Sequence, residues 1–305
     1  MAEILRGGVI GAGVFGGYHA GQYAKAAGAI FACVLDPDPV AGAALVARHG
    51  GQHVADLDQF LSLVDVVTVA SPAIYHAAGT LAALRAGKPV YVEKPLAISL
   101  EEADQMIGEA SRRNLVLACG HQERVVSEVI GLLAIPERPL RMTATRHGPP
   151  SERSLDVSVV LDLMIHDLDL AIALTSALPF AVEAQGQVAY SGGWDQVSAE
   201  VTFDDGFTAQ FDASRMAQGR HRTVSLTYPS GEVEIDFITR QFRNTTPYGL
   251  NANYADDPAF KDPLGVSVAG FLAAVRGQAP RPVVTASEAA GALDLALAVE
   301  RALTE

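Results

Sequence analysis

The sequence predicts an α/β protein with a doubly wound parallel sheet in residues 1–120 and an α+β domain with a mainly antiparallel open sheet in residues 121–305. The first 120 residues alternate short apolar runs with longer helical patterns, which is typical of parallel strands joined by helices. After residue 121, one long helical pattern precedes several strand-like runs separated by tight turns, which favours antiparallel pairing. The length of 305 residues also exceeds the usual size of one domain.

In the first domain, runs rich in β-branched residues predict five strands, at residues 6–10, 30–35, 66–70, 89–93 and 116–119. The patterns between them predict helices at residues 15–27, 40–48, 75–86 and 100–112. Ser99 precedes the last helix and Glu102 follows three residues later, which predicts a capping box. Gly28 and Gly87 stand where helices commonly end.

The second domain begins with a predicted helix over residues 156–177. Five strands follow, at residues 182–190, 198–203, 208–214, 223–228 and 233–237, and Gly-containing turns separate several of them. A stretch rich in Asn, Asp and Pro at residues 245–263 predicts a loop. The final helix, expected over residues 286–303, is apolar along one face and could pack back on the first domain.

Composition restricts the class of protein. A hydrophobic content of 49% with 19% charged residues indicates an ordered globular chain. The net charge of −13 argues against nucleic acid or an anionic membrane as a main partner, but not against a small anionic ligand. No apolar run reaches the roughly 18 residues of a membrane span. The amino terminus lacks a basic leader followed by a long apolar stretch, so we expect a cytoplasmic protein.

The sequence gives no indication of a bound metal. Cys33 and Cys119 lie in separate apolar runs without metal-site spacing, and we interpret them as buried side chains. Asp162 and His166 could bind a metal together, but two ligands are too few for a site.

A glycine-rich loop follows the first predicted strand. Gly11, Gly13 and Gly16 stand in G-x-G-x-x-G order, with Val14 and Phe15 between them at the start of the next helix. In this pattern the first glycine permits a tight turn, the second lets the backbone approach a pyrophosphate, and the third allows close packing. The free N–H groups of the helix then face the phosphates.

Asp36 strengthens this interpretation because it ends the second strand, 20 residues after Gly16. A carboxylate at this position binds the ribose hydroxyls of a dinucleotide. It would repel the 2′-phosphate of NADP, and no Lys or Arg follows it before Arg48. The sequence therefore predicts NAD binding, with NADP as the less favoured cofactor.

Two further segments carry residues suited to acid–base chemistry. Lys94 follows the strand at residues 89–93, and ligands of such sheets bind at the carboxyl ends of the strands. On the long helix, Asp162 and His166 share a face, and a carboxylate beside an imidazole helps it to act as a base. The alternatives are a surface lysine and a structural Asp–His pair. Asp167 and Asp169 are better suited to structural roles.

Three stretches together resemble the glucose–fructose oxidoreductase / inositol dehydrogenase / MocA (Gfo/Idh/MocA) family. They are the glycine loop, "SPAIYHAAGTLAALRAGKPVYVEKPLA" at residues 71–97 and "DLMIHDLDL" at residues 162–170. The resemblance implies an NAD-dependent sugar dehydrogenase that works as a homodimer or homotetramer through its open sheet. It implies that Lys94, Asp162 and His166 are catalytic. It also implies that four residues lie near the cofactor: Ser71, Pro72, His76 and Glu93. In such proteins the peptide bond between Lys94 and Pro95 is often cis.

A closer likeness concerns the substrate. "CGHQER" at residues 119–124 and the segment at residues 146–170 resemble the branch that oxidises UDP-N-acetylglucosamine at its 3-hydroxyl. That branch usually continues with Phe-Asn-Pro, where this chain has Val-Val-Ser at residues 125–127. Arg124, Arg146 and Arg153 are then candidates to bind the diphosphate, since arginine donors match phosphate geometry.

Three questions stay open at this point. The arginines could be ordinary surface residues paired with Glu123 or Glu152. The substrate could be a free sugar or an inositol, and the chain could also be a non-catalytic, dinucleotide-binding regulator. Either His166 or Lys94 could be the base.

Overall fold

The computed structural model describes residues 4–150 and 155–304. The described chain forms two compact units. One comprises the residues up to Gln122 together with Asp262–Ala290, and the other comprises Glu123–Lys261 and the residues from Gly291 onward. The sequence places the boundary between two domains at residue 120, and this boundary stays a prediction. The packing of the final helix on the first domain also stays a prediction.

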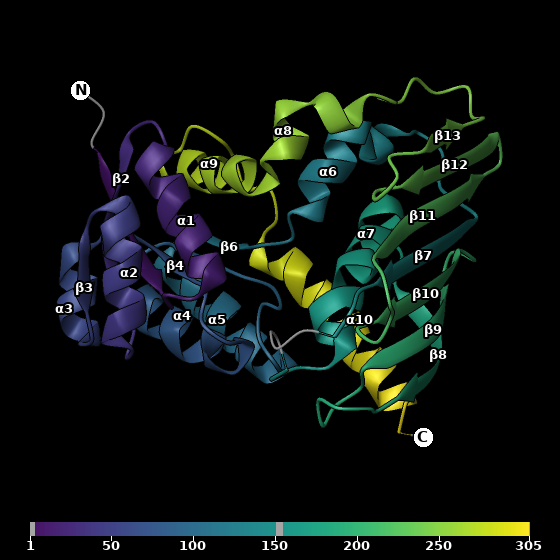
Figure 1. Ribbon diagram of the computed structural model, residues 1–305. Helices are drawn as coiled ribbons and strands as arrows, with labels where there is room; N and C mark the ends of the chain where they lie inside the picture. Colours follow the sequence, from purple (N-terminus) through teal and green to yellow (C-terminus); the bar gives the residue numbers. More distant parts are fainter. Residues whose placement is uncertain (1–3, 151–154, 305) are drawn as a thin grey trace. The chain divides into compact units, whose positions relative to one another are not determined.

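The first unit is built on a six-stranded sheet with helices between the strands (Figure 1). Its strands are β1 (Leu5–Ile10), β2 (Ala29–Leu35), β3 (Gln52–Val54), β4 (Val66–Val69), β5 (Val90–Val92) and β6 (Leu117–Cys119). They lie in the order β3-β2-β1-β4-β5-β6, and all pairs are parallel. This confirms the predicted doubly wound sheet.

The helical elements of this unit are α1 (Val14–Lys25), α2 (Pro39–His49), α3 (Leu57–Leu63), η1 (Ala73–Tyr75), α4 (His76–Arg85), α5 (Leu100–Arg113) and α9 (Pro263–Val275). At the start of α5, Ser99 Oγ accepts a hydrogen bond from the Glu102 N–H at 3.2 Å, as the capping box predicts. The Glu102 carboxylate accepts from the Ile98 N–H rather than from that of Ser99.

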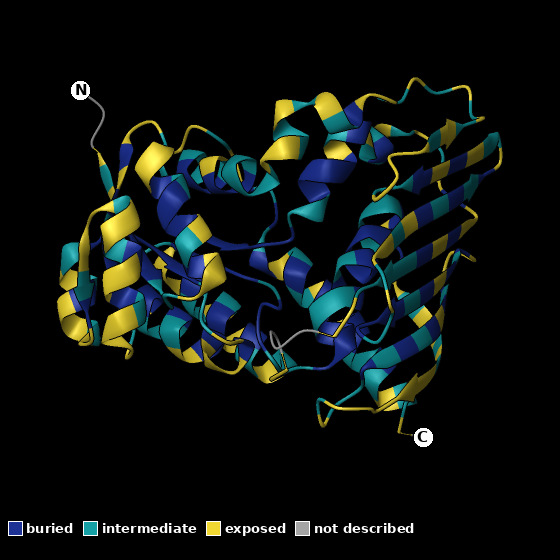
Figure 2. Ribbon diagram, in the orientation of Figure 1, coloured by how far each residue is buried: buried dark blue, intermediate teal, exposed yellow. Residues whose placement is uncertain are grey.

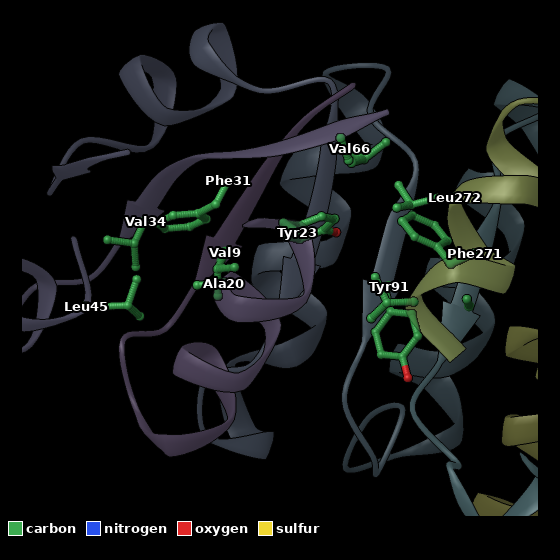
Figure 3. Packing of buried hydrophobic residues seen from close by; sticks show 13 residues of the cluster. Val9, Ala20, Tyr23, Phe31, Val34, Leu45, Val66, Tyr91, Phe271 and Leu272 are labelled. Carbon is green, nitrogen blue, oxygen red and sulfur yellow. The ribbon is translucent and has the colours of Figure 1, made fainter. Parts of the chain in front are cut away.

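Three elements of this unit are not predicted by the sequence pattern. β3 and α3 are short, with 3 and 7 residues, so neither shows a clear period. α9 begins at the end of the predicted loop and is apolar nearly all round, which hides its helical period. Its side chains Phe271 and Leu272 join the buried core of the unit, beside Tyr91 and Val66 (Figure 3).

The second unit is built on a seven-stranded, mostly antiparallel sheet. Its strands are β7 (Arg141–His147), β8 (Pro179–Gln187), β9 (Gln196–Phe203), β10 (Thr208–Ser214), β11 (His221–Tyr228), β12 (Gly231–Asp236) and β13 (Phe242–Asn244). They lie in the order β13-β12-β11-β7-β10-β9-β8, in which only β7 and β10 pair in parallel. The predicted antiparallel open sheet is confirmed. β7 and β13 are additions to it, and β8 begins three residues earlier than expected.

Burial alternates along these strands, so that one face of the sheet packs against helices and the other is open (Figure 2). Met142 and Ala144 are buried, whereas their neighbour Thr143 is exposed and lines a hollow of about 550 Å³ on the open face with Glu200 and Asp212. The remaining helical elements are α6 (Glu123–Ile130), η2 (Leu132–Ala134), η3 (Val160–Met164), α7 (Ile165–Thr175), η4 (Tyr254–Asp256) and α8 (Pro258–Lys261). The final helix, α10 (Ala286–Ala302), begins in the first unit and continues in the second.

The turn between β8 and β9 is organised by one buried carboxylate. Asp195 Oδ2 accepts hydrogen bonds from the backbone N–H groups of Ala189, Tyr190 and Ser191, at 2.7, 2.8 and 3.3 Å. Burial raises the pKa of Asp195, but the hydrogen bonds from this turn outweigh it and lower the pKa to about 2.

Other features bear on the class of protein. Within the described residues, no helix has the length and apolar character needed to cross a bilayer, and no three His, Cys, Asp or Glu side chains are grouped as metal ligands. Both cysteines are buried and free of disulfides, and burial raises the pKa of Cys33 to about 11.

Candidate active site

The glycine loop joins β1 to α1 and depends on the absence of side chains. Gly11 has a φ of +102°, and a Cβ there would lie 2.8 Å from the carbonyl oxygen of Ala70. A Cβ at Gly16 would overlap the carbonyl oxygen of Gly11. A Cβ at Gly13 would meet no described atom within 4 Å, so the space above Gly13 is open to a ligand. These observations fit a dinucleotide whose pyrophosphate approaches the backbone.

The first turn of α1 is accessible. Val14 and Phe15 are 46% and 41% exposed, and the N-cap residue Gly13 has no side chain to occupy the free N–H groups. The first turn itself carries no acidic residue, so no carboxylate of the helix occupies its positive end. An anion is the partner that such a helix end favours.

Asp36 lies directly after β2, beside the glycine loop. Its carboxylate accepts hydrogen bonds from the Ala12 N–H at 2.6 Å and from the Asp38 N–H at 2.8 Å. Each oxygen keeps a further lone pair for a ribose hydroxyl. Asp36 therefore fits the predicted position, and it also fixes the conformation of the loop.

The residues after β4 form a second boundary of the loop. Ser71 and Pro72 precede η1, and His76 is the first residue of α4. The His76 ring is 1% exposed, with Nδ1 2.7 Å from the carbonyl oxygen of Pro95 and Nε2 2.9 Å from that of Ser71. Contact of Ser71, Pro72 and His76 with the cofactor stays a prediction.

Lys94 follows β5, at the carboxyl end of the sheet, and its peptide bond to Pro95 is cis, as predicted. The preceding residue, Glu93, is 5% exposed, and its Oε1 lies 2.6 Å from His19 Nε2 and 3.0 Å from Gln122 Nε2. The Glu93 carboxylate is therefore held by protein donors, and its position near the cofactor stays a prediction.

In the second unit, Asp162 and His166 lie on consecutive helical segments. Asp162 is in the π-helical turn η3, and His166 is in the first turn of α7. The sequence predicts one regular helix, and the π turn is a departure from it of the kind that often occurs at functional sites. Both side chains are partly buried.

Ser158 holds the start of this segment. Its hydroxyl oxygen accepts from the N–H groups of Val160 and Leu161, at 3.2 and 3.3 Å, and the hydroxyl donates to Glu300 of α10. Burial raises the pKa of Glu300, and the Ser158 hydrogen bond only partly opposes this.

Two of the three candidate phosphate-binding arginines contact carboxylates of α7. Arg124 binds Asp169 through Nε at 2.6 Å and Nη2 at 2.9 Å. Arg146 binds Asp167 through Nε at 3.0 Å and Nη2 at 2.8 Å. Arg153 lies outside the described residues. The geometry gives Arg124 and Arg146 a structural use, while diphosphate binding by them stays a prediction.

Glu123 extends this set of charges, as the alternative of arginines paired with Glu123 allows. Its carboxylate pairs with Arg146 at 3.5 Å and with Arg222, whose guanidinium carbon lies 4.3 Å from the centre of the Phe237 ring. Burial raises the pKa of Glu123, but Arg222 and Arg146 outweigh it and lower the pKa. Arg222 lies on β11, far away in the chain, so no local signal could reveal it.

Comparison with known proteins gives the family of each part of the chain. The family model of an oxidoreductase with an NAD-binding Rossmann fold, Gfo/Idh/MocA, matches residues 5–121. The model of the Gfo/Idh/MocA C-terminal domain matches residues 138–234.

Individual relatives match over most of the chain. UDP-N-acetylglucosamine 3-dehydrogenase of Acidithiobacillus ferrooxidans is 34% identical over 310 aligned residues, which cover 97% of each chain. A solved structure of that enzyme superposes with a TM-score of 0.89 at 33% identity, covering 98% of this chain and 97% of that one. The NAD⁺-dependent scyllo-inositol 2-dehydrogenase of Bacillus subtilis is 28% identical and covers 72% of this chain and 70% of its own.

Proposed function

The chain belongs to the Gfo/Idh/MocA family of NAD-binding oxidoreductases, and on that premise we propose that it oxidises the 3-hydroxyl of a UDP-linked N-acetylhexosamine. The observation that carries this proposal is the 34% identity to a UDP-N-acetylglucosamine 3-dehydrogenase over 97% of both chains. Membership of an oxidoreductase family sets aside the non-catalytic regulator.

The cofactor is NAD, which when bound accepts or supplies the hydride at its nicotinamide ring. We propose that the glycine loop and the start of α1 bind its phosphates and that Asp36 binds its ribose. The open space above Gly13 and the uncapped helix end support this role. The residues that we propose for this binding are Gly11, Gly13, Val14, Phe15, Gly16 and Asp36, with Ser71 and Pro72 beside them.

The protein must also move a proton, since a hydroxyl that becomes a carbonyl loses one as the hydride leaves. We propose that Lys94 and His166 are the catalytic residues of this step and that one of them is the base that removes the hydroxyl proton. Asp162 orients the His166 imidazole and stabilises its protonated form. The position of Lys94 at the carboxyl end of the sheet supports its assignment.

A panel of substrates tests the proposal directly. NADH production is measured with UDP-N-acetylglucosamine, free N-acetylglucosamine, glucose, myo-inositol and scyllo-inositol, each with NAD. We expect the highest kcat/KM with the sugar nucleotide. A higher kcat/KM with a free sugar or an inositol would refute the sugar-nucleotide assignment and leave the hydride transfer intact. The similarity to scyllo-inositol 2-dehydrogenase makes the inositols the relevant competitors.

We also propose that the open face of the seven-stranded sheet is covered by a second copy of the chain, in a homodimer or homotetramer. The hollow on that face, lined by hydrogen-bonding side chains such as Thr143, Ser198 and Gln210, supports this. Light scattering at micromolar concentration is the test, and a monomer would contradict it. The cytoplasmic location stays a prediction.

A further inference from the structure

The residues on both sides of Lys94 are held by buried side chains of the first unit. On the amino-terminal side, Glu93 Oε1 accepts hydrogen bonds from His19 at 2.6 Å and from Gln122 at 3.0 Å. The other oxygen lies beside Gly120, where a Cβ would come within 2.9 Å of Glu93 Oε2, so the glycine leaves space for the carboxylate. The carboxylate is therefore held through Oε1 by two donors.

On the carboxyl-terminal side, His76 Nδ1 lies 2.7 Å from the carbonyl oxygen of Pro95. The second nitrogen of the same ring contacts the carbonyl oxygen of Ser71 at 2.9 Å. His76 thus joins the backbone after Lys94 to the backbone after β4. Since the ring is 1% exposed and each nitrogen faces a carbonyl oxygen, little of its surface remains for a ligand.

The tautomer of His19 follows from its surroundings. His19 is fully buried, and its Nδ1 has no hydrogen-bond partner among the described atoms. A proton on Nδ1 would be a buried, unsatisfied donor, so the proton of the neutral ring belongs on Nε2. The Nε2–H then donates to Glu93, and the interaction is a charge-assisted hydrogen bond, which is stronger than a neutral one.

We propose that His19 and His76 are positioning residues that clamp Lys94 from its two sides. The inference rests on the proposed catalytic role of Lys94. His19 comes from α1, which starts at the glycine loop, and His76 comes from the start of α4. The two histidines therefore tie the lysine to the helices that follow the proposed cofactor-binding loops. They set where the amine stands without touching the substrate or the cofactor.

The test compares His19→Leu and His76→Leu with His19→Gln and His76→Gln, which keep an N–H donor. For each variant, kcat, the substrate KM, the Kd for NAD by calorimetry and the Tm are measured. Tyr23→Phe is the matched control, since Tyr23 lies on the same helix as His19 and makes a buried hydrogen bond to Thr68 at 2.9 Å. That bond ties α1 to β4 and does not involve Glu93.

We expect each leucine variant to lose kcat by about 10²-fold, since a displacement of about 1 Å at a catalytic group has that effect. The Kd for NAD should change by less than about threefold, and the glutamine variants should recover most of kcat. Tyr23→Phe should lower the Tm and leave kcat unchanged.

Each proposal has its own contrary result. If the wild-type protein oxidises no sugar or sugar nucleotide in the panel, the proposed function fails. If wild type is active and both leucine variants keep its kcat, the clamp is wrong. If weaker NAD binding, measured as a higher Kd, accounts for the whole loss of activity in His76→Leu, His76 contacts the cofactor instead of positioning Lys94. An equal loss of kcat in Tyr23→Phe would show general destabilisation.

Discussion

The glycine loop of the first unit and the helix α7 of the second prepare for function in opposite ways. The loop depends on side chains that are missing at Gly11, Gly13 and Gly16, and it offers backbone N–H groups to an anion. Helix α7 instead belongs to a network of three arginines and three carboxylates on α6, β7, β11 and α7 itself: Arg124, Arg146, Arg222, Glu123, Asp167 and Asp169.

This difference explains how much of each region could be predicted from the sequence. A loop that works through its own backbone is specified by neighbouring residues in the chain. A charge network is specified by residues that meet only after folding. The difference also suggests that substitutions destabilise the charge network more than the loop, because removing one member of a buried ion pair leaves an uncompensated charge.

The largest expected effect is on the stability of the charge network. Arg124→Met should lower the free energy of unfolding by about 3–5 kcal/mol, because Asp169 keeps a buried charge without its bidentate partner. The double variant Arg124→Met/Asp169→Leu should recover most of that loss. Urea unfolding measures both. A small loss in the single variant would show that the pair contributes little and would remove the contrast between the two regions.

The same double variant sharpens the assignment of Arg124. If the only role of Arg124 is to hold α7, the double variant should have a KM for UDP-N-acetylglucosamine close to that of wild type. If Arg124 also binds the diphosphate, the KM should stay at least about tenfold higher, as expected for the loss of a charged hydrogen-bond donor.

The next largest effect concerns the two proposed catalytic groups, one in each unit. Lys94→Ala and His166→Ala should each lower kcat by on the order of 10²-fold or more, with little change in the Tm. Lys88→Ala is the control, since Lys88 donates to the carbonyl oxygen of Val64 in the first unit. Turnover near that of wild type in both active-site variants would overturn the assignment.

A third effect depends on pH and tests the reliance of the second unit on ionised groups. The folded state lowers the pKa of Asp195 to about 2, so its stabilisation is present above the unfolded pKa of about 3.9 and is lost as the pH falls through about 2. Asp195→Asn should therefore lower the free energy of unfolding by about 2 kcal/mol at pH 7.

Measured down to pH 2, the difference between this variant and wild type should shrink steadily. Glu128→Gln, an exposed substitution in the same unit, should show no such trend. A difference that stays constant with pH would mean that the charge of Asp195 is not what stabilises the turn.

The smallest effect is expected at the glycine loop. Asp36→Ser should weaken NAD binding by about tenfold and narrow the gap to NADP, because the ribose loses a charged acceptor. The release of the Ala12 and Asp38 N–H groups adds to the loss. Asp36→Asn keeps the shape of the side chain, and its affinity for NAD should lie between those of wild type and Asp36→Ser. A wild-type protein that prefers NADP would contradict our interpretation of Asp36.

Much of the fold follows from local patterns in the chain. The parallel sheet, the antiparallel sheet and the capping hydroxyl of Ser99 are predicted from these patterns and observed. The cis bond before Pro95 is also observed, but its prediction comes from the family resemblance. Short or uniformly apolar elements such as α3 and α9 are not, because they lack a period that can be recognised. β7 is missed because its mixed polar residues join the sheet only through β10 and β11.

The site divides in the same way. The glycine loop, Asp36 and Lys94 can be placed from the sequence, since each is defined by its position after a strand. The partners of Arg124 and Arg146 cannot, because Asp169 and Asp167 lie far along the chain and compete with any phosphate for the same donors. His19 gives no signal of its own, since its partner Glu93 is 74 residues away.

The burial of both native thiols makes the surface of this protein a clean background for chemical labelling. Cys33 and Cys119 are both buried, and a Cys33 pKa of about 11 keeps that sulfur protonated at neutral pH. A single cysteine introduced at Thr143, on the open face of the sheet, would then be the reactive one. Its rate of alkylation at low and high protein concentration would report whether that face is shielded, with no need to remove either native cysteine.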